Sequence, residues 1–461
     1  MNIEQLYTGC LSQAAYFIES NGISAVIDPL RNVDQYIELS KKYNSKIKYI
    51  FETHFHADFV SGHISLSNKT GAKIVFGPNA DPKYDAIIST DNQVFKIGDL
   101  SLKVIHTPGH TLESTSYLLL DEKGKQKCLF TGDTFFLGDV GIPDVAQRYK
   151  GVSQEDLAAI LFDSINKKIK LLDKDILIYP GHGAGSACGK KMMKKTVDSL
   201  ENQLNVNYSI NGSYSKEMFV KKLIDDLPNP PAYFPENVKL NQDGYTDLDK
   251  IIKQSLVPLT IEHFINYSQN EGCIIIDTRS KKEFRKGHVP NSIFVGLDGQ
   301  FAPWVGSIVK NIKTKILLVC ECGKELESIV RLSRTGFDHV VGYLNGGFES
   351  WKKHEKIFSK IDQISPDEIN SLNNTMNILD VRKKTELDQG KVTSSLNFPL
   401  NDFDKEMESF DKSKQYYVYC AGGYRSMIAC SLMKKNGFSN VVNIYGGYTE
   451  IKKINSNITE L

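Results

Sequence analysis

Four short apolar segments in the first half of the chain are each followed by a histidine or an aspartate. The four residues are His54, His110, Asp133 and His182, and a glycine or another small residue precedes each of them. The ends of neighbouring strands meet along one edge of a sheet, where side chains from separate strands can assemble into one site. An isolated buried histidine is ordinarily structural, but four such strand ends together favour a metal centre. The first half must therefore fold so that these ends converge.

The first of these ends carries the densest group of ligand-type side chains. Residues 53–59 are Thr-His-Phe-His-Ala-Asp-Phe, and the apolar segment 47–51 before them predicts a strand. Two histidines at i and i+2 and an aspartate at i+4 can converge on one cation if this segment is an irregular loop. His54, His56 and Asp58 are therefore candidate ligands or neighbours of a metal. A phenyl ring cannot ligate a metal, so Phe59 limits what the loop can bind.

Composition restricts the class of protein. The chain has 461 residues, a hydrophobic content of 41%, a charged content of 24% and a formal net charge of +1. These values are those of a soluble globular protein of several domains. The near-neutral charge gives no argument for a nucleic-acid partner or a membrane surface, and no long apolar run predicts a transmembrane helix or signal peptide. The expected compartment is the cytoplasm, where the eight scattered cysteines would be reduced thiols.

Residues 274–290 and 378–392 repeat one another in the second half of the chain. Each copy has an Asp-x-Arg motif after an apolar segment, then a cysteine after the next apolar segment, and later a Gly-Gly pair. Strands that alternate with helices predict a parallel sheet in each copy.

Helix-start signals and a proline-rich stretch help to predict the domain boundaries. A capping-box pattern at Ser153 predicts the start of a helix, and the proline-rich stretch 227–235 predicts a linker or surface arm. We therefore expect an α/β chain of three domains, at residues 1–240, 255–357 and 362–461.

The cysteine of the second copy opens a loop suited to sulfur chemistry. Small residues and glycines after a strand let backbone N–H groups turn inward at the start of a helix and form an anion-binding nest. Such dipoles and a neighbouring arginine lower the pKa of a thiol and make it nucleophilic. The loop residues are Cys420, Ala421, Gly422, Gly423, Tyr424, Arg425 and Ser426. Cys420 and Arg425 are the candidate catalytic pair.

The first copy departs from this pattern. Its loop begins at Cys320, and Glu325 stands where the second copy has Arg425. A nearby carboxylate raises a thiol pKa and repels anions, so we expect this copy to be inactive. An alternative is that Cys320 and Cys322 form a redox or metal-binding pair. Lys391 in the second copy replaces His288 of the first, and we interpret that position as structural.

The motifs of the first half resemble those of the metallo-β-lactamase superfamily, in which an H-x-H-x-D-H motif is followed by Gly-His, Gly-Asp and Gly-His. The resemblance implies a four-layered αβ/βα sandwich. Binuclear members, such as glyoxalase II, have a second-metal histidine directly after the aspartate. This chain has Phe59 there, so the resemblance implies one metal.

Within that superfamily, residues 6–16, 138–144 and 180–186 are similar to the persulfide dioxygenase branch. The similarity implies one Fe(II) per chain, held by His54, His110 and Asp133, a ligand set suited to O₂ chemistry. His56, Asp58 and His182 would then orient ligands or water. The branch usually has an arginine where this chain has Ile142, which leaves the thiol carrier undefined.

The repeats in the second half resemble rhodanese domains, in which the loop cysteine carries a persulfide. The whole layout resembles fusions of a persulfide dioxygenase with a sulfurtransferase. It implies that a glutathione, coenzyme A or bacillithiol persulfide is oxidised by O₂ to sulfite, and that Cys420 exchanges sulfur between sulfite and thiosulfate. A homo-oligomer is expected by analogy alone.

Two other functions remain open. One is a glyoxalase II-type thioester hydrolase with a binuclear zinc site. The other is a non-catalytic persulfide carrier or sensor. Cys188, near His182 and Lys190 in the sequence, is a possible thiol relay, against the simpler interpretation of a buried packing residue.

Overall fold

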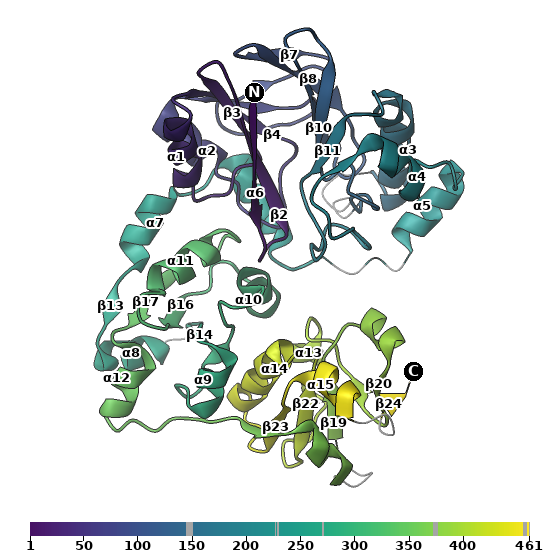
Figure 1. Ribbon diagram of the computed structural model, residues 1–461. Coiled ribbons are helices and arrows are strands. Elements are labelled where there is room, and N and C mark those ends of the chain that lie inside the picture. Colours follow the sequence, from purple (N-terminus) through teal and green to yellow (C-terminus); the bar gives the residue numbers. More distant parts are fainter. Residues whose placement is uncertain are drawn as a thin grey trace. The chain divides into compact units, whose positions relative to one another are not determined.

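The apolar segments of the first half form two six-stranded sheets in the computed structural model, which describes residues 1–143, 151–225, 227, 230–269, 272–371, 377–454 and 459–460 (Figure 1). In sequence order the strands are β1 (Asn2–Thr8), β2 (Gln13–Ser20), β3 (Ile23–Ile27), β4 (Lys46–Glu52), β5 (Lys73–Phe76), β6 (Ile87–Ile88), β7 (Val94–Ile97), β8 (Leu100–His106), β9 (Thr115–Leu120), β10 (Gln126–Gly132), β11 (Leu177–Pro180) and β12 (Asp198–Ser199). The first sheet has the order β1-β2-β3-β4-β5-β6, and the second has the order β12-β11-β10-β9-β8-β7.

The two sheets pack face to face over an aromatic core. Tyr16 of β2 lies against Phe130 of β10, and Phe51 of β4 lies against Tyr117 of β9, with ring centroids 4.9 Å apart in both pairs. All four side chains are fully buried. Burial on this scale fixes which face of each strand points inward, and so fixes the edge at which the strand ends meet.

Helices cover the outer face of each sheet (Figure 1). Helices α1 (Asp34–Lys42) and α2 (His63–Thr70) contact the first sheet at β4. Helices α3 (Gln154–Lys167) and α5 (Lys216–Ile224) pack on the second sheet, where Leu161 and Phe219 join one apolar cluster. Ser153 caps α3 and forms a capping box with Asp156, as predicted. The four-layered αβ/βα arrangement predicted for the first domain is confirmed.

The proline-rich stretch is not a linker throughout. Pro228 and Asn229 lie outside the described residues, but Phe234 and Pro235 open helix α6 (Phe234–Asp243). Proline is accepted there because the first helical N–H groups have no partner within the helix. Helix α4 (Leu200–Val206) also belongs to this half, and α7 (Leu248–Ser255) crosses the boundary between the two compact units. The first compact unit contains Met1–Ile251 and Ser333–Gly336, so it extends beyond the expected boundary at 240.

The second compact unit, Ile252–Leu332 and Phe337–Leu461, contains both repeats. Its strands are β13 (Pro258–Leu259), β14 (Ile274–Asp277), β15 (Ile293–Phe294), β16 (Ile316–Val319), β17 (Val340–Leu344), β18 (Asp362–Ile364), β19 (Asn377–Asp380), β20 (Lys391–Val392), β21 (Leu396–Asn397), β22 (Tyr416–Tyr419), β23 (Val441–Ile444) and β24 (Thr459–Glu460). Two five-stranded sheets have the equivalent orders β13-β17-β16-β14-β15 and β18-β23-β22-β19-β21. Their strands pair in parallel, as predicted.

Helices join the parallel strands of both repeats. They are α8 (Ile261–Ser268), α9 (Lys281–Lys286), α10 (Phe301–Val309), α11 (Glu325–Ser333), α12 (Gly347–Lys353), α13 (Phe403–Met407), α14 (Tyr424–Lys435) and α15 (Gly447–Ile454). Crossovers of this length are what parallel strand pairs require.

The repeated Asp-x-Arg motif is a buried ion pair in both copies. Arg279 donates to both carboxylate oxygens of Asp277 and to the carbonyl of Gly287. Arg382 makes the same bonds to Asp380 and Gly390. Each pair ties a strand end to the following loop, which explains the motif as structural in both copies.

Acid should destabilise the second unit through His288, which is 1% exposed and stacks on Phe284 with ring centroids 3.9 Å apart. Burial lowers the pKa of His288 to about 4. An unfolded histidine has a pKa of about 6.5, so stability that is present above pH ~6.5 is lost as pH falls toward 4, by up to roughly 1.4 kcal/mol per pH unit. His288→Phe should flatten this dependence in urea unfolding between pH 4 and 6.5. The exposed His263 gives the control, since His263→Phe should leave the slope unchanged.

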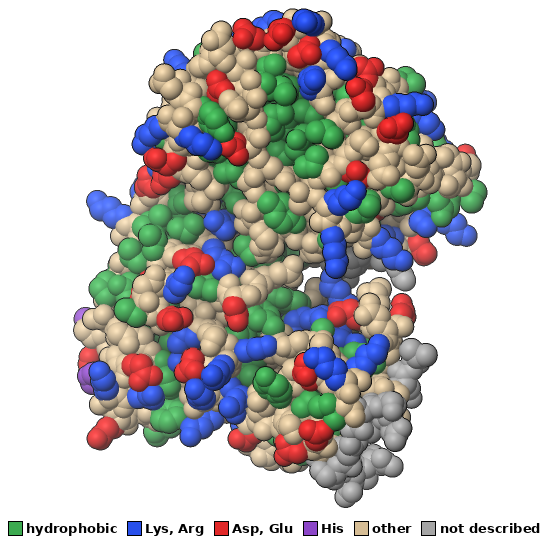
Figure 2. All heavy atoms as spheres, viewed as in Figure 1, with side chains coloured by type: hydrophobic (Ala, Val, Ile, Leu, Met, Phe, Trp, Pro, Cys, Tyr) green, Lys and Arg blue, Asp and Glu red, His purple; other side chains and the backbone are tan. Residues whose placement is uncertain are grey.

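On the face shown in Figure 2, basic and acidic side chains are interspersed on both units. No helix among the described residues is both long and apolar enough to cross a membrane.

Candidate functional sites

Three of the four predicted strand ends place their polar side chains around one point. The ligand atoms of His54, His110 and Asp133 lie within 4.8 Å of one another. These residues follow β4, β8 and β10, and all are at most 3% exposed. Nε2 of His110 is 3.8 Å from Oδ2 of Asp133. Two imidazoles and one carboxylate at this spacing can hold a divalent transition metal on one face.

The carboxylate of Asp133 fits a cation rather than a hydrogen-bonded role. Asp133 is 1% exposed, and neither of its oxygens has a hydrogen-bond partner among the described residues. A buried carboxylate without donors is strongly unfavourable, because it has lost water and gained nothing in return. A metal ion bound between Asp133 and the two histidines would remove that penalty.

Hydrogen bonds fix the ring orientation of both histidines. The Thr53 hydroxyl donates to Asp28 at 2.9 Å, so it accepts from Nδ1 of His54, also at 2.9 Å. Nδ1 of His110 donates to the carbonyl of Ile142 at 2.6 Å. Both rings therefore carry their proton on Nδ1 and leave the Nε2 lone pair for a metal. This is the support that metal-binding histidines usually receive.

His182 and Asp58 form a second group beside the first, together with Cys188. Nε2 of His182 is 3.4 Å from Asp58 and 3.6 Å from Asp133, and its Nδ1 donates to the Ser12 carbonyl at 3.2 Å. Burial raises the pKa of the Asp58 carboxyl. Asp58, His182 and Cys188 are all buried, so they can act on whatever occupies the space next to Asp133.

Lys190 contacts the C-terminal end of α5. Its ammonium donates to the backbone carbonyls of Lys222 and Asp225. It therefore holds the end of α5.

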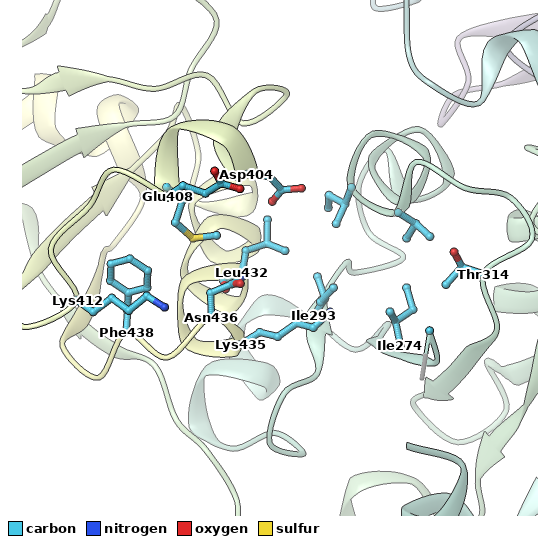
Figure 3. A pocket seen from close by; sticks show the side chains of 14 residues that line it. Ile274, Ile293, Thr314, Asp404, Glu408, Lys412, Leu432, Lys435, Asn436 and Phe438 are labelled. Atoms are coloured by element: carbon cyan, nitrogen blue, oxygen red, sulfur yellow. The ribbon is translucent and has the colours of Figure 1, made fainter. Parts of the chain in front are cut away.

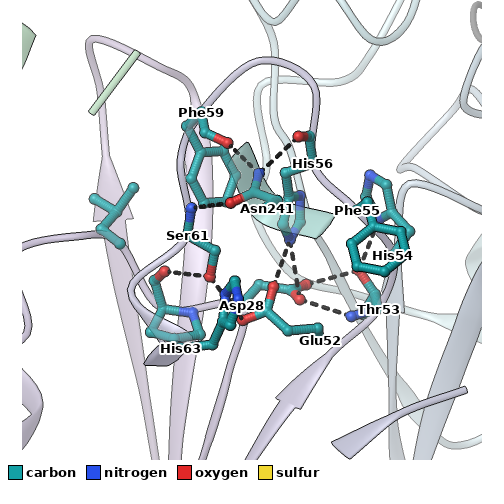
Figure 4. A network of polar contacts seen from close by, with 12 residues as sticks. Asp28, Glu52, Thr53, His54, Phe55, His56, Phe59, Ser61, His63 and Asn241 are labelled. Carbon is teal, nitrogen blue, oxygen red and sulfur yellow. Dashed lines mark hydrogen bonds and ion pairs between the residues drawn. The ribbon is translucent and has the colours of Figure 1, made fainter. Parts of the chain in front are cut away.

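His56 belongs to a separate buried cluster with Asp28 and Glu52 (Figure 4). Nε2 of His56 is 3.1 Å from Asp28 and 3.5 Å from Glu52. Burial opposes a charge on His56, but the two carboxylates outweigh it and hold the pKa of His56 well above its usual value. The Phe59 ring stacks on the other side, with centroids 4.3 Å apart. His56 can thus brace the loop that carries His54.

Sequence reasoning missed the acidic members of this cluster. Asp28 directly follows the apolar strand β3. The same pattern identified the other strand ends, so it could have identified Asp28. Burial raises the pKa of Glu52 to about 7. Glu52 also accepts a hydrogen bond from Ser61 at 2.6 Å.

Asn241 of α6 holds the same loop from a distant part of the chain. Its amide nitrogen donates to the carbonyls of His56 and Phe59, both at 2.8 Å, and its oxygen accepts from the Ser61 N–H at 2.9 Å (Figure 4). Asn241 is 1% exposed. No local pattern marks such a residue, because its partners lie far away in the sequence.

The cysteine loop of the second repeat follows β22 and precedes α14. Cys420 is 2% exposed, and its sulfur accepts a hydrogen bond from the Gly423 N–H at 3.1 Å. A backbone donor at this distance stabilises a thiolate or the outer sulfur of a persulfide. Tyr424 and Ser426 point elsewhere, since their hydroxyls donate to the Gly296 carbonyl and to Asn443.

Arg425 is bound to an acid that sequence reasoning did not single out. Its two terminal nitrogens donate to the two carboxylate oxygens of Glu386, at 2.6 and 2.7 Å. Glu386 aligns with Glu283 across the repeat, which was the available signal. The pair fixes the position of the guanidinium next to the loop and neutralises much of its charge.

The corresponding cysteine of the first repeat lies in an unfavourable setting. Burial, with Glu325 and Asp277 adding to it, raises the pKa of Cys320 to about 11. Cys322 is exposed while Cys320 is buried, and neither belongs to a group of possible metal ligands among the described residues. This environment supports the expectation that the first repeat lacks a reactive thiol.

Comparisons with known proteins match these two halves. The metallo-beta-lactamase superfamily profile matches residues 8–182, and the rhodanese-like domain profile matches residues 260–354 and 365–454. A solved metallo-beta-lactamase from Staphylococcus aureus subsp. aureus COL is 31% identical in sequence and superposes with a TM-score of 0.64. The match covers 75% of this chain and 98% of the solved chain. The chain belongs to the metallo-beta-lactamase superfamily. Its metallo-beta-lactamase domain is followed by two rhodanese-like domains.

Curated relatives carry a hydrolase name. Hydroxyacylglutathione hydrolase from Arabidopsis thaliana is 26% identical over 226 residues, which cover 48% of this chain and 79% of the relative. Its counterpart from Dictyostelium discoideum is 32% identical over 169 residues, which cover 36% of this chain and 59% of the relative.

Ile142 of the metallo-beta-lactamase domain does not line an open entrance. Its side chain is 5% exposed and joins the apolar cluster beneath the second sheet. Its backbone instead supports the site, through the carbonyl that fixes His110 and an N–H donated to the Cys188 carbonyl at 3.0 Å.

Gly181→Ala should empty the candidate metal centre of the metallo-beta-lactamase domain. A Cβ at this position would lie 2.6 Å from Oδ1 of Asp133 and 3.0 Å from the Gly132 carbonyl carbon. The carboxylate must then move from the position facing the histidines. We expect at least a tenfold loss of bound metal, measured by elemental analysis. Gly9→Ala is the control, because Gly9 has nothing within 4 Å of its Cβ position and no left-handed backbone conformation; comparable loss in both variants would contradict this prediction.

The two rhodanese-like domains also line an open pocket of about 480 Å³ (Figure 3). Asp404, Glu408 and Lys435 are among its lining residues, whereas Cys420 is not. The pocket is therefore separate from the cysteine loop.

Proposed function

We propose that the metallo-beta-lactamase domain is a persulfide dioxygenase with one Fe(II) per chain. The observation that carries the proposal is the buried, unpartnered carboxylate of Asp133, which faces His54 and His110. In the loop of His54, Phe59 stands where a second-metal histidine would be. The reaction is R–S–SH + O₂ + H₂O → R–SH + SO₃²⁻ + 2H⁺, in which the outer sulfur is oxidised and O₂ is reduced.

The residues around the metal would have different roles. His54, His110 and Asp133 would hold Fe(II), which supplies O₂ activation and positions open to the persulfide sulfur. Asp58 and His182 lie next to Asp133, where they can order a water molecule and pass a proton. His56, Asp28 and Asn241 keep the loop rigid, so that the ligand geometry is formed before substrate binds.

The second rhodanese-like domain would carry sulfur on Cys420. Its loaded form reacts with sulfite as Cys–S–S⁻ + SO₃²⁻ → Cys–S⁻ + S₂O₃²⁻, so the outer sulfur leaves the cysteine and bonds to the sulfite sulfur. The reverse reaction would draw sulfane sulfur from thiosulfate. Either direction lowers the burden of sulfide or reactive sulfur. The co-occurrence of both sites on one chain supports the pairing.

Oxygen consumption tests the dioxygenase proposal. The full chain, purified without oxygen and loaded with Fe(II), would be given glutathione, coenzyme A and bacillithiol persulfides in turn. Oxygen uptake and sulfite release with at least one of them are expected. The absence of uptake with all three would overturn the proposal.

A thioester hydrolase is the second candidate, because two observations favour it. The relatives from Arabidopsis thaliana and Dictyostelium discoideum are named hydroxyacylglutathione hydrolases. Asp58, His182 and Cys188 converge beside Asp133, so a thiolate could replace the histidine that Phe59 removes and complete a second metal site. Two zinc ions per chain, together with hydrolysis of a glutathione thioester, would favour this candidate over the dioxygenase.

A further inference from the structure

The two rhodanese-like domains meet directly at the cysteine loop. Within the second compact unit, helix α14 packs against β15 and α9 of the first rhodanese-like domain. The hydroxyl of Ser431 accepts from the Phe294 N–H at 3.0 Å, and the hydroxyl of Tyr424 donates to the Gly296 carbonyl at 2.6 Å. Tyr424 and Phe294 are also in ring contact, with centroids 5.5 Å apart. A residue of the Cys420 loop is thus anchored in the other domain.

The first domain is shaped to receive this tyrosine. A Cβ at Gly299 would lie 2.5 Å from the Tyr424 ring, so only glycine leaves room for it. Gly299 therefore supports a specific docking of Tyr424, which fixes where neighbouring groups of the first domain stand relative to the loop.

Lys281 is the group that this docking brings to the loop. It is the first residue of α9, whose N-terminus is capped by Ser280. Its ammonium donates to the Gly422 carbonyl at 2.7 Å, and a Cβ at Gly423 would lie 3.4 Å from the same nitrogen. The ammonium therefore lies over the Gly422–Gly423 peptide of the Cys420 loop.

The charge balance makes Lys281 distinctive. Arg425 is paired with both oxygens of Glu386, and Arg382 is paired with Asp380, so neither contributes a whole free charge. In the described part of the chain, Lys281 has no carboxylate partner. Unlike Arg425 and Arg382, Lys281 therefore keeps a positive charge that no carboxylate among the described residues neutralises.

We propose that the first rhodanese-like domain supplies Lys281 as an anion-binding residue of the Cys420 site. Its ammonium attracts the oxygens of sulfite and thiosulfate to the mouth of the loop. The proposal deepens the sulfurtransferase function proposed above and rests on it. The first domain is then a necessary part of the second domain's specificity for anions.

Acceptors of different charge test this proposal in the full chain. Lys281→Met keeps the length of the side chain and removes its charge. Thiosulfate that carries an isotopic label on its outer sulfur would load Cys420, and the label would be passed either to unlabelled sulfite, a dianion, or to 2-mercaptoethanol, which is neutral. We expect KM for thiosulfate and sulfite to rise about three- to tenfold, with a weaker dependence on salt, because a cation at the rim of a site acts mainly through attraction. KM for 2-mercaptoethanol and kcat should stay within about twofold.

Matched variants separate the possible causes. Lys282→Met removes an exposed charge from the next position of the same helix and should change none of these constants. Lys281→Arg should restore most of the affinity for sulfite. Equal effects of Lys281→Met on sulfite and 2-mercaptoethanol, or unchanged constants for both, would overturn the role of Lys281. Failure of the proposed function looks different, since the unaltered chain would then transfer no sulfur from thiosulfate at all.

Discussion

Cys420→Ser should abolish the exchange of isotopically labelled outer sulfur between thiosulfate and sulfite, with a loss of about 10³-fold or more in kcat/KM, since loss of a nucleophile removes the covalent pathway. The cysteine sulfur is the acceptor of the Gly423 N–H, and a serine oxygen there cannot form a persulfide. Mass spectrometry after incubation with thiosulfate gives a second readout. Cys420 should gain one sulfur atom, and the serine variant should gain none at this position.

The same variant should leave persulfide oxidation intact. Persulfide-dependent oxygen uptake by the iron-loaded chain should stay within about twofold of the unaltered chain, because the proposed metal ligands belong to a different compact unit. Cys320→Ser is the matched control, since burial and Glu325 hold the pKa of Cys320 at about 11. Loss of sulfur transfer in the Cys320 variant would contradict the inactive state of the first repeat. Equal loss of transfer and oxidation in the Cys420 variant would show that the two reactions are obligatorily coupled.

Local patterns in the sequence predicted the fold of this protein well. The Asp-x-Arg and Gly-Gly motifs indicated a repeat, and the alternation of strands with helices in each copy predicted two parallel sheets, which the fold confirms. These signals are readable because each depends on residues a few positions apart. The strand-end rule also led to His54, His110 and Asp133, whose side chains the structure brings together.

What escaped sequence reasoning depends on distant pairs. Asn241 reaches the His56 loop from helix α6, which begins within the proline-rich stretch 227–235. Lys281 reaches the Gly422 carbonyl from the other repeat. In both cases, the sequence shows an ordinary polar residue, and only the packing of separate elements gives it a partner. Glu386 is intermediate, because its match with Glu283 was visible while its bond to Arg425 was not.

Substitution of Asp58 separates a residue that lies beside the proposed metal from a residue that binds it. Asp58→Asn changes a buried carboxylate beside His182, outside the group formed by His54, His110 and Asp133. It should retain most of the bound iron, and it should slow oxidation by about 10- to 100-fold, as expected for a residue that orients ligands or moves protons. It therefore serves as the control for the corresponding change at Asp133.

Asp133→Asn should lower bound iron at least tenfold and reduce persulfide-dependent oxygen uptake by about 10³-fold, because an amide of the same shape lacks the negative charge that a metal requires. The substitution also removes a buried negative charge that has no hydrogen-bond donor. The thermal stability of the metal-free chain should therefore rise or stay unchanged. Elemental analysis, oxygen uptake and thermal unfolding measure the three effects. Sulfur transfer by Cys420 should persist and shows that the variant is folded. Oxidation that survives this change would exclude the proposed iron site, and persulfide binding without oxidation in the unaltered chain would indicate a carrier or sensor instead.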